Sequence, residues 1–269
     1  MIFKQLVRNL VLMAIYPRPF IGLAYLPKYI SQWIKFNQLN TENKLCFADA
    51  YPNLSDWVTK TPFDPHYFYQ GAWLARQLAE AHPVRHFDVG SDVKLIGAIS
   101  AFVPTEFMDF RPLDVTLPGL DCTRGDIKAL PMTDSSVLSV SCLHVVEHIG
   151  LGRYGDPLDP EGSRKALREL ERVVSPGGRL YLSVPVGRER ICFNAHRIFS
   201  PEFIVAAMPS LTLRNFSYVD DNGHFLEYQP LAAAQSLDYG CGMFCFEKIK
   251  RHPNTTPSGL SAISRASRE

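Results

Sequence analysis

Four groups of acidic, glycine and histidine residues are candidates for chemistry, because each lies next to a short apolar run. They are Asp88–Asp92, Asp109, Gly125–Ile127 and His144–His148. A carboxylate can accept hydrogen bonds from two sugar hydroxyls, and a backbone beside an apolar side chain can hold a flat base. Each of the four groups alone is weak evidence for a ligand site.

The elements that must position these groups alternate between strands and helices. Apolar residues at helical spacing predict helices over 64–81, 95–102 and 163–174, and another that begins at Ser200-Pro201. Short apolar runs predict strands over 84–89, 106–110, 137–143, 179–184, 211–219 and 240–248. This order predicts an α/β fold with a mostly parallel sheet, covered on both faces, and an antiparallel edge strand. Ligands of such sheets bind at the carboxyl ends of the strands, where the four groups fall.

Composition excludes several other classes of protein. The chain has 269 residues, of which 46% are hydrophobic and 20% charged, as in ordinary globular proteins. Its net charge is 28 − 27 = +1, so a dedicated nucleic-acid binder is not expected. None of the six cysteines forms a C-x-x-C pair, which favours a reducing cytoplasm and argues against a zinc ribbon. No uncharged apolar run reaches the ~18 residues that a membrane-spanning helix needs.

Composition and patterning divide the chain into four regions. Residues 1–41 form a basic and apolar segment, 42–83 a helical lead-in, 84–250 the α/β domain, and 251–269 a disordered tail. The first 41 residues carry five cations and no acid. This segment is interpreted either as a helical cap on the α/β domain, as an anchor at an anionic membrane surface through residues 1–36, or as an export signal. The expected location is the cytoplasm or the inner membrane surface.

Several strings, taken in order, resemble the class I methyltransferases that use S-adenosylmethionine. Gly125–Met132, Val145–Ile149 and Val174–Gly178 carry this resemblance, which extends over residues 84–248. Glu147–Asp156 and Phe193–Arg197 are similar to an uncharacterised family within that superfamily, known only as a domain of unknown function. The resemblance implies a Rossmann-like fold and S-adenosylmethionine as the cofactor.

The resemblance also implies which residues hold the cofactor. In this chain they are Asp88, Gly90, Ser91, Asp109, Asp126, Ile127 and His144. Asp109 would accept from the ribose hydroxyls, Asp126 and Ile127 would face the adenine, and Gly90 would allow close approach. Asp92 and Lys94 stand where these enzymes usually have further glycines, so the loop either still binds the cofactor or has lost it.

The candidate catalytic bases are His148 and His196. Arg153, Tyr154, Asp156 and Arg197 are the candidate substrate-binding residues, because the loop after His148 is long for an α/β connection. We expect methyl transfer to a hydroxyl of a small polar or glycan-type acceptor. The alternative is a catalytically inactive methyltransferase-like module for binding or assembly. An NAD-dependent oxidoreductase is disfavoured because the full G-x-G-x-x-G is missing.

The His-x-x-Glu-His string at 144–148 has three interpretations. It matches a metalloprotease pattern, but that chemistry needs both histidines on one helix, whereas this string follows a buried strand. We expect no metal, with His144 as a wall of the cofactor site and Glu147 and His148 as a hydrogen-bonded pair. The alternative is a divalent ion on His144, Glu147 and His148, with His196 as a fourth ligand.

Overall fold

The computed structural model describes residues 23–42, 44–54 and 56–250, which form parts of two compact units. The first unit extends to Phe63 and contains helix α3, Leu26–Leu39, and a short 3-10 helix, Phe47–Asp49. Lys28 and Tyr25 both pack on the ring of Trp57 within this unit. The predictions for residues 1–22 and for the 251–269 tail lie outside the described residues.

The second unit, from Asp64 onward, is built on an eight-stranded sheet in the order β3-β2-β1-β4-β5-β10-β8-β9. Its strands are β1 His86–Val89, β2 Thr105–Asp109, β3 Leu120–Arg124, β4 Val137–Leu143, β5 Val174–Val186, β8 Thr212–Val219, β9 Phe225–Leu226 and β10 Gly240–Glu247. The pairs from β3 to β5 are parallel, whereas β10 is antiparallel to both β5 and β8. This confirms the predicted α/β fold with a mostly parallel sheet.

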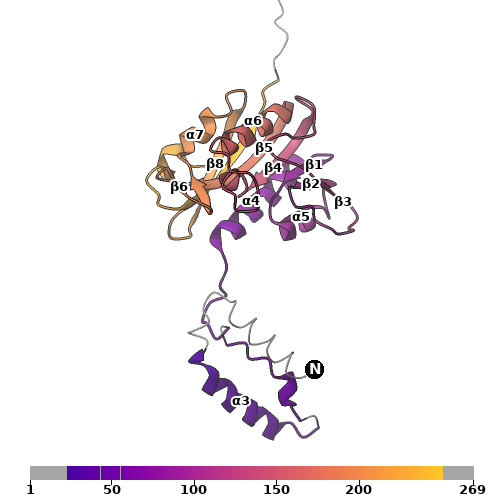
Figure 1. Ribbon diagram of the computed structural model, residues 1–269, viewed down its shortest axis with the longest axis vertical. Coiled ribbons are helices and arrows are strands. Elements are labelled where there is room, and N and C mark those ends of the chain that lie inside the picture. The colour runs from indigo at the N-terminus through magenta and orange to yellow at the C-terminus, as the bar shows by residue number, and fades with distance from the viewer. Residues whose placement is uncertain (1–22, 43, 55, 251–269) are drawn as a thin grey trace, which may run out of the picture. The chain divides into compact units, whose positions relative to one another are not determined.

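Helices cover both faces of this sheet (Figure 1). Helices α4, Pro65–Ala81, and α5, Val93–Ile99, bury apolar side chains against one face, and α6, Gly162–Val173, and α7, Pro201–Ala206, against the other. Side-chain oxygens of Asp64, Asp92 and Ser200 cap the amino ends of α4, α5 and α7. A separate hairpin joins β6, Arg190–Cys192, to β7, His196–Ile198. Two 3-10 turns, Val146–His148 and Leu231–Ala234, complete the unit.

The structure differs from the sequence prediction at several elements. Strands β3, β6, β7 and β9 were not predicted, because they are short or mostly polar and lack an apolar pattern. Strand β5 begins at Val174, directly after α6, and so is longer than 179–184. Strand β10 pairs with β5 and β8 inside the sheet, and the short strand β9 completes the antiparallel edge that the sequence predicts. Helix α4 packs on the sheet and belongs to its unit, rather than to a lead-in that ends at 83.

Candidate functional site

One cavity opens at the carboxyl ends of β1, β2 and β4, where the sequence places the four candidate groups. Its empty volume is about 800 Å³ when the open solvent at its mouth is included. The residues that line it are Val89, Gly90, Met108, Asp109, Phe110, Arg111, Gly125, Asp126, Ile127, Lys128, His144, Val145, His148, Ile149, Tyr154, Asp156 and Pro157. The fold therefore brings Gly90, Asp109, Asp126, Ile127 and His144 together, as predicted from the sequence.

Gly90 forms the floor of the cavity between β1 and α5. Its φ is +68°, a left-handed conformation that costs a side chain roughly 1–2 kcal/mol. A Cβ at this position would lie 3.2 Å from Cγ2 of Val145 and 3.4 Å from Oδ2 of Asp109. Both the backbone conformation and the space left beside Asp109 therefore favour glycine here.

Asp88 and Ser91 lie beneath this loop and do not line the cavity. Asp88 is fully buried and accepts hydrogen bonds from the backbone N–H and the hydroxyl of Ser91, and from the hydroxyl of Ser141. Ser91 Oγ also accepts from the backbone N–H of Leu143 at 3.0 Å. Burial raises the pKa of Asp88 to about 6, and these hydrogen bonds oppose the rise. The pair ties the Gly90 loop to β4 in the structure, a role different from the cofactor contacts predicted for them.

Asp92 and Lys94 leave the cavity open. Asp92 Oδ1 accepts the backbone N–H groups of Lys94 and Leu95 at 3.0 and 3.1 Å, and so caps α5. Both Asp92 and Lys94 are exposed, and neither lines the cavity. Asp92 therefore caps α5, Lys94 is exposed, and neither side chain fills the cavity.

Two carboxylates flank the cavity at the ends of β2 and β3. Asp109 Oδ1 accepts from the backbone N–H of Arg111 at 2.6 Å, and its Oδ2 lies over Gly90. Asp126 Oδ1 accepts from the backbone N–H of Lys128 at 2.9 Å, while the side chain of Ile127 is buried. These contacts fix a hydroxyl-accepting carboxylate on one side and a turn with an apolar side chain on the other.

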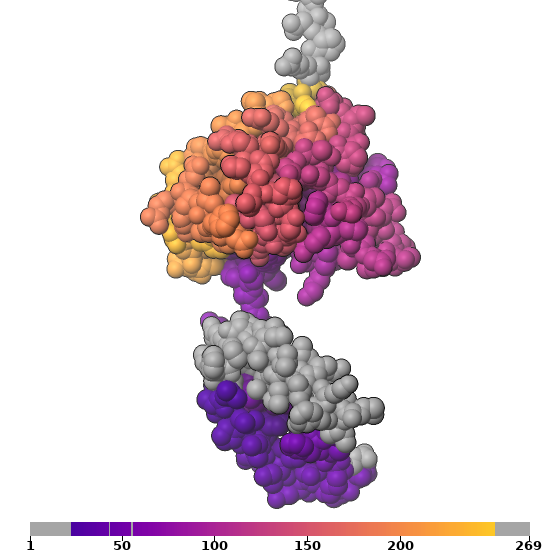
Figure 2. Space-filling view, viewed as in Figure 1, coloured from indigo at the N-terminus to yellow at the C-terminus, as the bar shows by residue number. Residues whose placement is uncertain are grey.

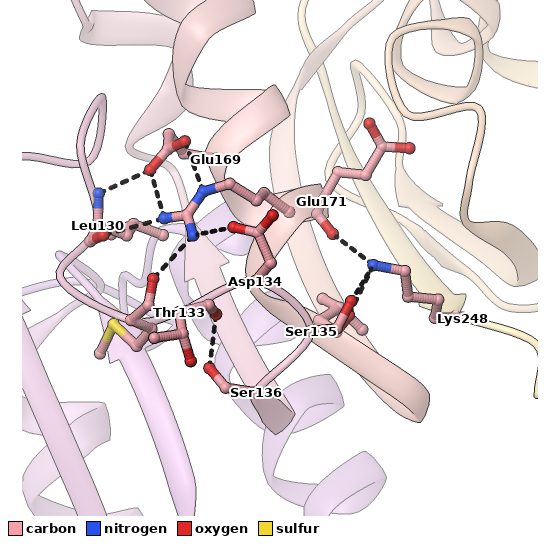
Figure 3. A network of polar contacts seen from close by, with 11 residues as sticks. Leu130, Thr133, Asp134, Ser135, Ser136, Glu169, Glu171 and Lys248 are labelled. Atoms are coloured by element: carbon pink, nitrogen blue, oxygen red, sulfur yellow. Dashed lines mark hydrogen bonds and ion pairs between the residues drawn. The ribbon is translucent and has the colours of Figure 1, made fainter.

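A network centred on Arg172 of α6 holds the segment that follows Asp126 (Figure 3). The guanidinium donates to the carbonyls of Leu130 and Met132 and to the carboxylates of Asp134 and Glu169. Glu169 also accepts from the backbone N–H of Leu130 at 2.8 Å. Helix α6 thereby positions the loop that carries Asp126 and Ile127.

Glu147 is fully buried in the 3-10 turn after β4, between two histidines. Its Oε1 lies 3.0 Å from Nδ1 of His144 and 3.6 Å from Nε2 of His148. Among the described residues, neither carboxylate oxygen has a hydrogen bond of good geometry. His144 has a φ of +55° and directs Nε2 to Sγ of Cys241 at 3.2 Å. His144, Glu147 and His148 lie together, with Cys241 beside them from β10, but Glu147 and His148 do not form the predicted hydrogen-bonded pair, because their atoms are 3.6 Å apart.

The two predicted bases occupy different places. His148 lines the cavity, and its Nδ1 lies 2.6 Å from the carbonyl oxygen of Ala195. His196 begins β7, packs on the ring of Tyr239 at 4.9 Å between centroids and does not line the cavity. Burial lowers the pKa of both histidines, against the opposing charge of Glu147, so both are mostly neutral at pH 7. His148 is therefore the better placed of the two.

The predicted substrate loop packs against the β6–β7 hairpin. In Figure 2 the orange surface of the hairpin borders the rose surface of the loop after His148. Arg153 donates to the carbonyl of Ala195, and buried Arg197 donates to the carbonyl of Ile149 and the hydroxyl of Ser163. Tyr154 and Asp156 line the cavity, whereas Arg153 and Arg197 connect the loop to the hairpin.

Sequence reasoning missed several residues of this region. Arg111 lines the cavity, and its guanidinium lies 4.5 Å from the centre of the Tyr154 ring. His66 and Tyr67, from the first turn of α4, lie beside His144. Periodicity showed that α4 was a helix but gave no signal that its first turn meets the end of β4.

Comparison with known families gives one match. Residues 134–222 match the DUF268 family. Its description is "Caenorhabditis protein of unknown function". The match confirms the resemblance, found in the sequence, to a domain of unknown function. No protein with a curated description matches the sequence.

Solved structures with a similar fold include several methyltransferases. The N-methyltransferase NodS from Bradyrhizobium japonicum WM9, in complex with S-adenosyl-L-homocysteine, is 13% identical, with a TM-score of 0.49 over 81% of this chain and 98% of that one. The YcgJ protein from Bacillus subtilis is 12% identical, with a TM-score of 0.48 over 68% and 100%. Geranyl diphosphate methyltransferase, in complex with GPP and sinefungin, is 12% identical, with a TM-score of 0.47 over 68% and 78%. The second unit has the Rossmann-like α/β fold predicted from the sequence, with β10 inserted antiparallel between β5 and β8.

Proposed function

We propose that this chain is an S-adenosylmethionine-dependent methyltransferase that transfers the methyl group to a hydroxyl of a small polar or glycan-type acceptor. One observation carries the proposal. Gly90, Asp109 and the Asp126-Ile127 turn, from the ends of three strands, line a single cavity that the side chains at 92 and 94 leave open. A nucleoside needs this combination of a close backbone, a hydroxyl acceptor and an apolar clamp.

The cofactor would lie across these three groups. Asp109 would accept the ribose hydroxyls, because its Oδ2 faces the space over Gly90. Asp126 and Ile127 would hold the adenine, and the Arg172 network would keep their loop in place. When bound, the cofactor supplies a methyl group on a good sulfonium leaving group.

The residues of this chain then have two tasks, alignment and proton removal. Alignment of an acceptor hydroxyl with the methyl carbon contributes on the order of several kcal/mol. His148 lines the cavity in its neutral form and can accept the hydroxyl proton, while Tyr154 and Asp156 form the adjacent wall. His196 remains a second candidate base if the acceptor extends toward the hairpin.

Calorimetry tests cofactor binding. We expect saturable binding of S-adenosylmethionine by the full chain and, for Asp109→Ala, a loss of about 2–4 kcal/mol, or roughly 30- to 1,000-fold in Kd, because two hydrogen bonds to a charged group disappear. Asp121→Ala is the matched control, because Asp121 is an exposed acid on the neighbouring strand β3, paired with Arg85. Flat heats for the unmodified chain would favour the alternative, an inactive module for binding or assembly.

The acceptor class is tested by transfer of a labelled methyl group. The unmodified chain would be incubated with labelled S-adenosylmethionine and separate pools of sugars, phenols and amines. We expect label in the sugar or phenol pool, and at least a 100-fold slower rate for His148→Asn, within the range of general base catalysis, about 10²–10⁴-fold. Label confined to the amine pool would contradict hydroxyl transfer.

The first unit supports a finer proposal, contact with an anionic membrane surface inside the cell. Leu23, Ile30 and Ile34 expose about half of their surface on or beside α3, close to Lys28 and Lys35. Basic residues near such a surface contribute about 1 kcal/mol each. None of the described helices could span a membrane. Flotation with anionic vesicles should recover the full chain but not a chain without residues 1–36, and equal recovery would exclude this contact.

A further inference from the structure

Three side chains that are far apart in the sequence converge on one point beside the cavity. His66 comes from the first turn of α4, His144 from the end of β4, and Cys241 from the buried strand β10. One ligand atom from each, a ring nitrogen or the sulfur, lies within 4.8 Å of the other two. Cys241 and His144 are buried, and His66 is partly exposed.

These distances are close to those of a tetrahedral zinc site. Zn–N bonds of about 2.0–2.1 Å and Zn–S bonds of about 2.3 Å place the ligand atoms of such a site roughly 3.3–3.6 Å apart. Nε2 of His144 is already 3.2 Å from Sγ of Cys241. His66 lies in the first turn of α4 and is partly exposed, so we expect a side-chain movement there to close the remaining gap to the other two ligand atoms.

Glu147 lies where a metal-bound histidine would need a carboxylate, 3.0 Å from His144, although the contact is not a well-aligned hydrogen bond in this structure. Histidine ligands usually donate their second ring N–H to a carboxylate, which fixes the tautomer that leaves the other nitrogen free for the metal. Nδ1 of His144 lies 3.0 Å from Oε1 of buried Glu147, and Nε2 faces the sulfur. The charges also balance, since one thiolate and one carboxylate neutralise a divalent cation.

The backbone of His144 provides a separate indication. Its φ of +55° is uncommon for a residue with a side chain, and residues held in this region concentrate at functional sites. This conformation turns the imidazole from the end of β4 toward Glu147 on one side and Cys241 on the other. The strained position is the one that connects the carboxylate to the thiol.

We propose that His66, His144 and Cys241 bind one Zn²⁺ ion, with Glu147 as the positioning residue for His144. Three protein ligands leave the fourth tetrahedral position open, as in catalytic rather than structural zinc sites. An ion there would bind a hydroxyl or thiol and lower its pKa. Since His144 also lines the cavity, the ion would lie at the edge of the proposed cofactor site. The metal site itself does not depend on the proposed function.

The set His144, Glu147, His148 and His196, an alternative from the sequence, fits less well. Among the described residues, His66, His144 and Cys241 have ligand atoms that all lie within 4.8 Å of one another, and this other set does not. The ring of His196 packs on Tyr239. The soft thiol of Cys241, which zinc favours, is absent from that set.

Metal binding to the full chain tests the proposal. Protein stripped with a chelator would be titrated with Zn²⁺ alone, followed by elemental analysis, and with Co²⁺ alone, followed by absorption spectroscopy. We expect one equivalent of either ion and a cobalt spectrum with tetrahedral d–d bands and a thiolate charge-transfer band. Cys241→Ser should abolish the charge-transfer band, and His66→Ala should weaken binding at least 100-fold. Glu147→Gln should weaken it about 10- to 100-fold.

Cys245→Ser is the matched control, because Cys245 is a second buried cysteine on the same strand and in the same apolar cluster. It should bind both ions like the unmodified chain. His66→Ala keeps the test valid if Cys241→Ser does not fold, as judged by circular dichroism. Substoichiometric binding by the unmodified chain, or binding by His66→Ala equal to it, would overturn the proposal. Calorimetry with S-adenosylmethionine on stripped protein reports separately on the cofactor, so the two proposals can fail independently.

Discussion

Replacing Gly90 with alanine addresses the fold and the site together. The substitution places a Cβ on a residue with a φ of +68°, which costs roughly 1–2 kcal/mol. The new methyl would also lie 3.2 and 3.3 Å from the two γ-carbons of Val145, closer than ordinary contact. We expect Gly90→Ala to lower the free energy of unfolding by about 2 kcal/mol, or Tm by roughly 4–8 °C for a unit of this size.

The same methyl would project into the cavity next to Asp109. It would lie 3.4 Å from Oδ2, the oxygen proposed to accept a ribose hydroxyl. We expect the Kd for S-adenosylmethionine to rise at least 10-fold, which corresponds to a loss of about 1.4 kcal/mol. Urea denaturation and calorimetry on the same preparation measure the two effects.

Gly97 offers a matched control. It lies within α5, and a Cβ there would meet nothing within 4 Å. Gly97→Ala should therefore stabilise the protein by up to about 1 kcal/mol through helix propensity and leave cofactor binding unchanged. If Gly90→Ala matched Gly97→Ala in both stability and affinity, the assignment of Gly90 as the cavity floor would be refuted.

Three further predictions concern polar groups that hold the loops around the cavity. Burial raises the pKa of Asp88 from 3.8 to about 6, so folding binds a proton, and stability is lost as the pH rises from about 4 to about 6. Relative to the unmodified chain, Asp88→Asn should thus gain about 2 kcal/mol between pH 4 and pH 7 in urea denaturation, and a constant difference would contradict the shift. Arg172→Ala should lower the unfolding free energy by about 2 kcal/mol and weaken cofactor binding. Arg172→Lys should recover less than half of the lost stability, because lysine lacks the planar guanidinium, and full recovery would show that charge alone suffices. Arg197→Ala should lower the free energy of unfolding by about 2 kcal/mol and speed amide hydrogen exchange in the loop after His148. Unchanged amide exchange together with weaker acceptor binding would instead make Arg197 a substrate ligand.

The sequence by itself determined the elements that have a clear period or cap. Helix α4 begins after Asp64 as predicted, because a capping carboxylate precedes a proline and an apolar face. Strand β4 has the predicted bounds, 137–143, because its apolar run is buried and ends at polar residues. The candidate cofactor residues Gly90 and Asp109 were also found this way, since predicted strands of a parallel sheet end there and such ends converge at one edge. Asp126 was identified from the resemblance, because the strand before it, β3, has no apolar pattern.

Only the tertiary structure decided which long-range neighbours meet. Strand β3 is mostly polar, and its pairing with β2 rather than its own pattern defines it as a strand. Asp88 looks like a cofactor ligand in the sequence, yet burial beneath the Gly90 loop makes it an anchor. Nothing local links His66 to Cys241; they meet because α4 packs on the sheet where β10 inserts beside β5. Sequence patterns report a residue's own period and chain neighbours, whereas sites assembled from separate elements depend on how those elements pack.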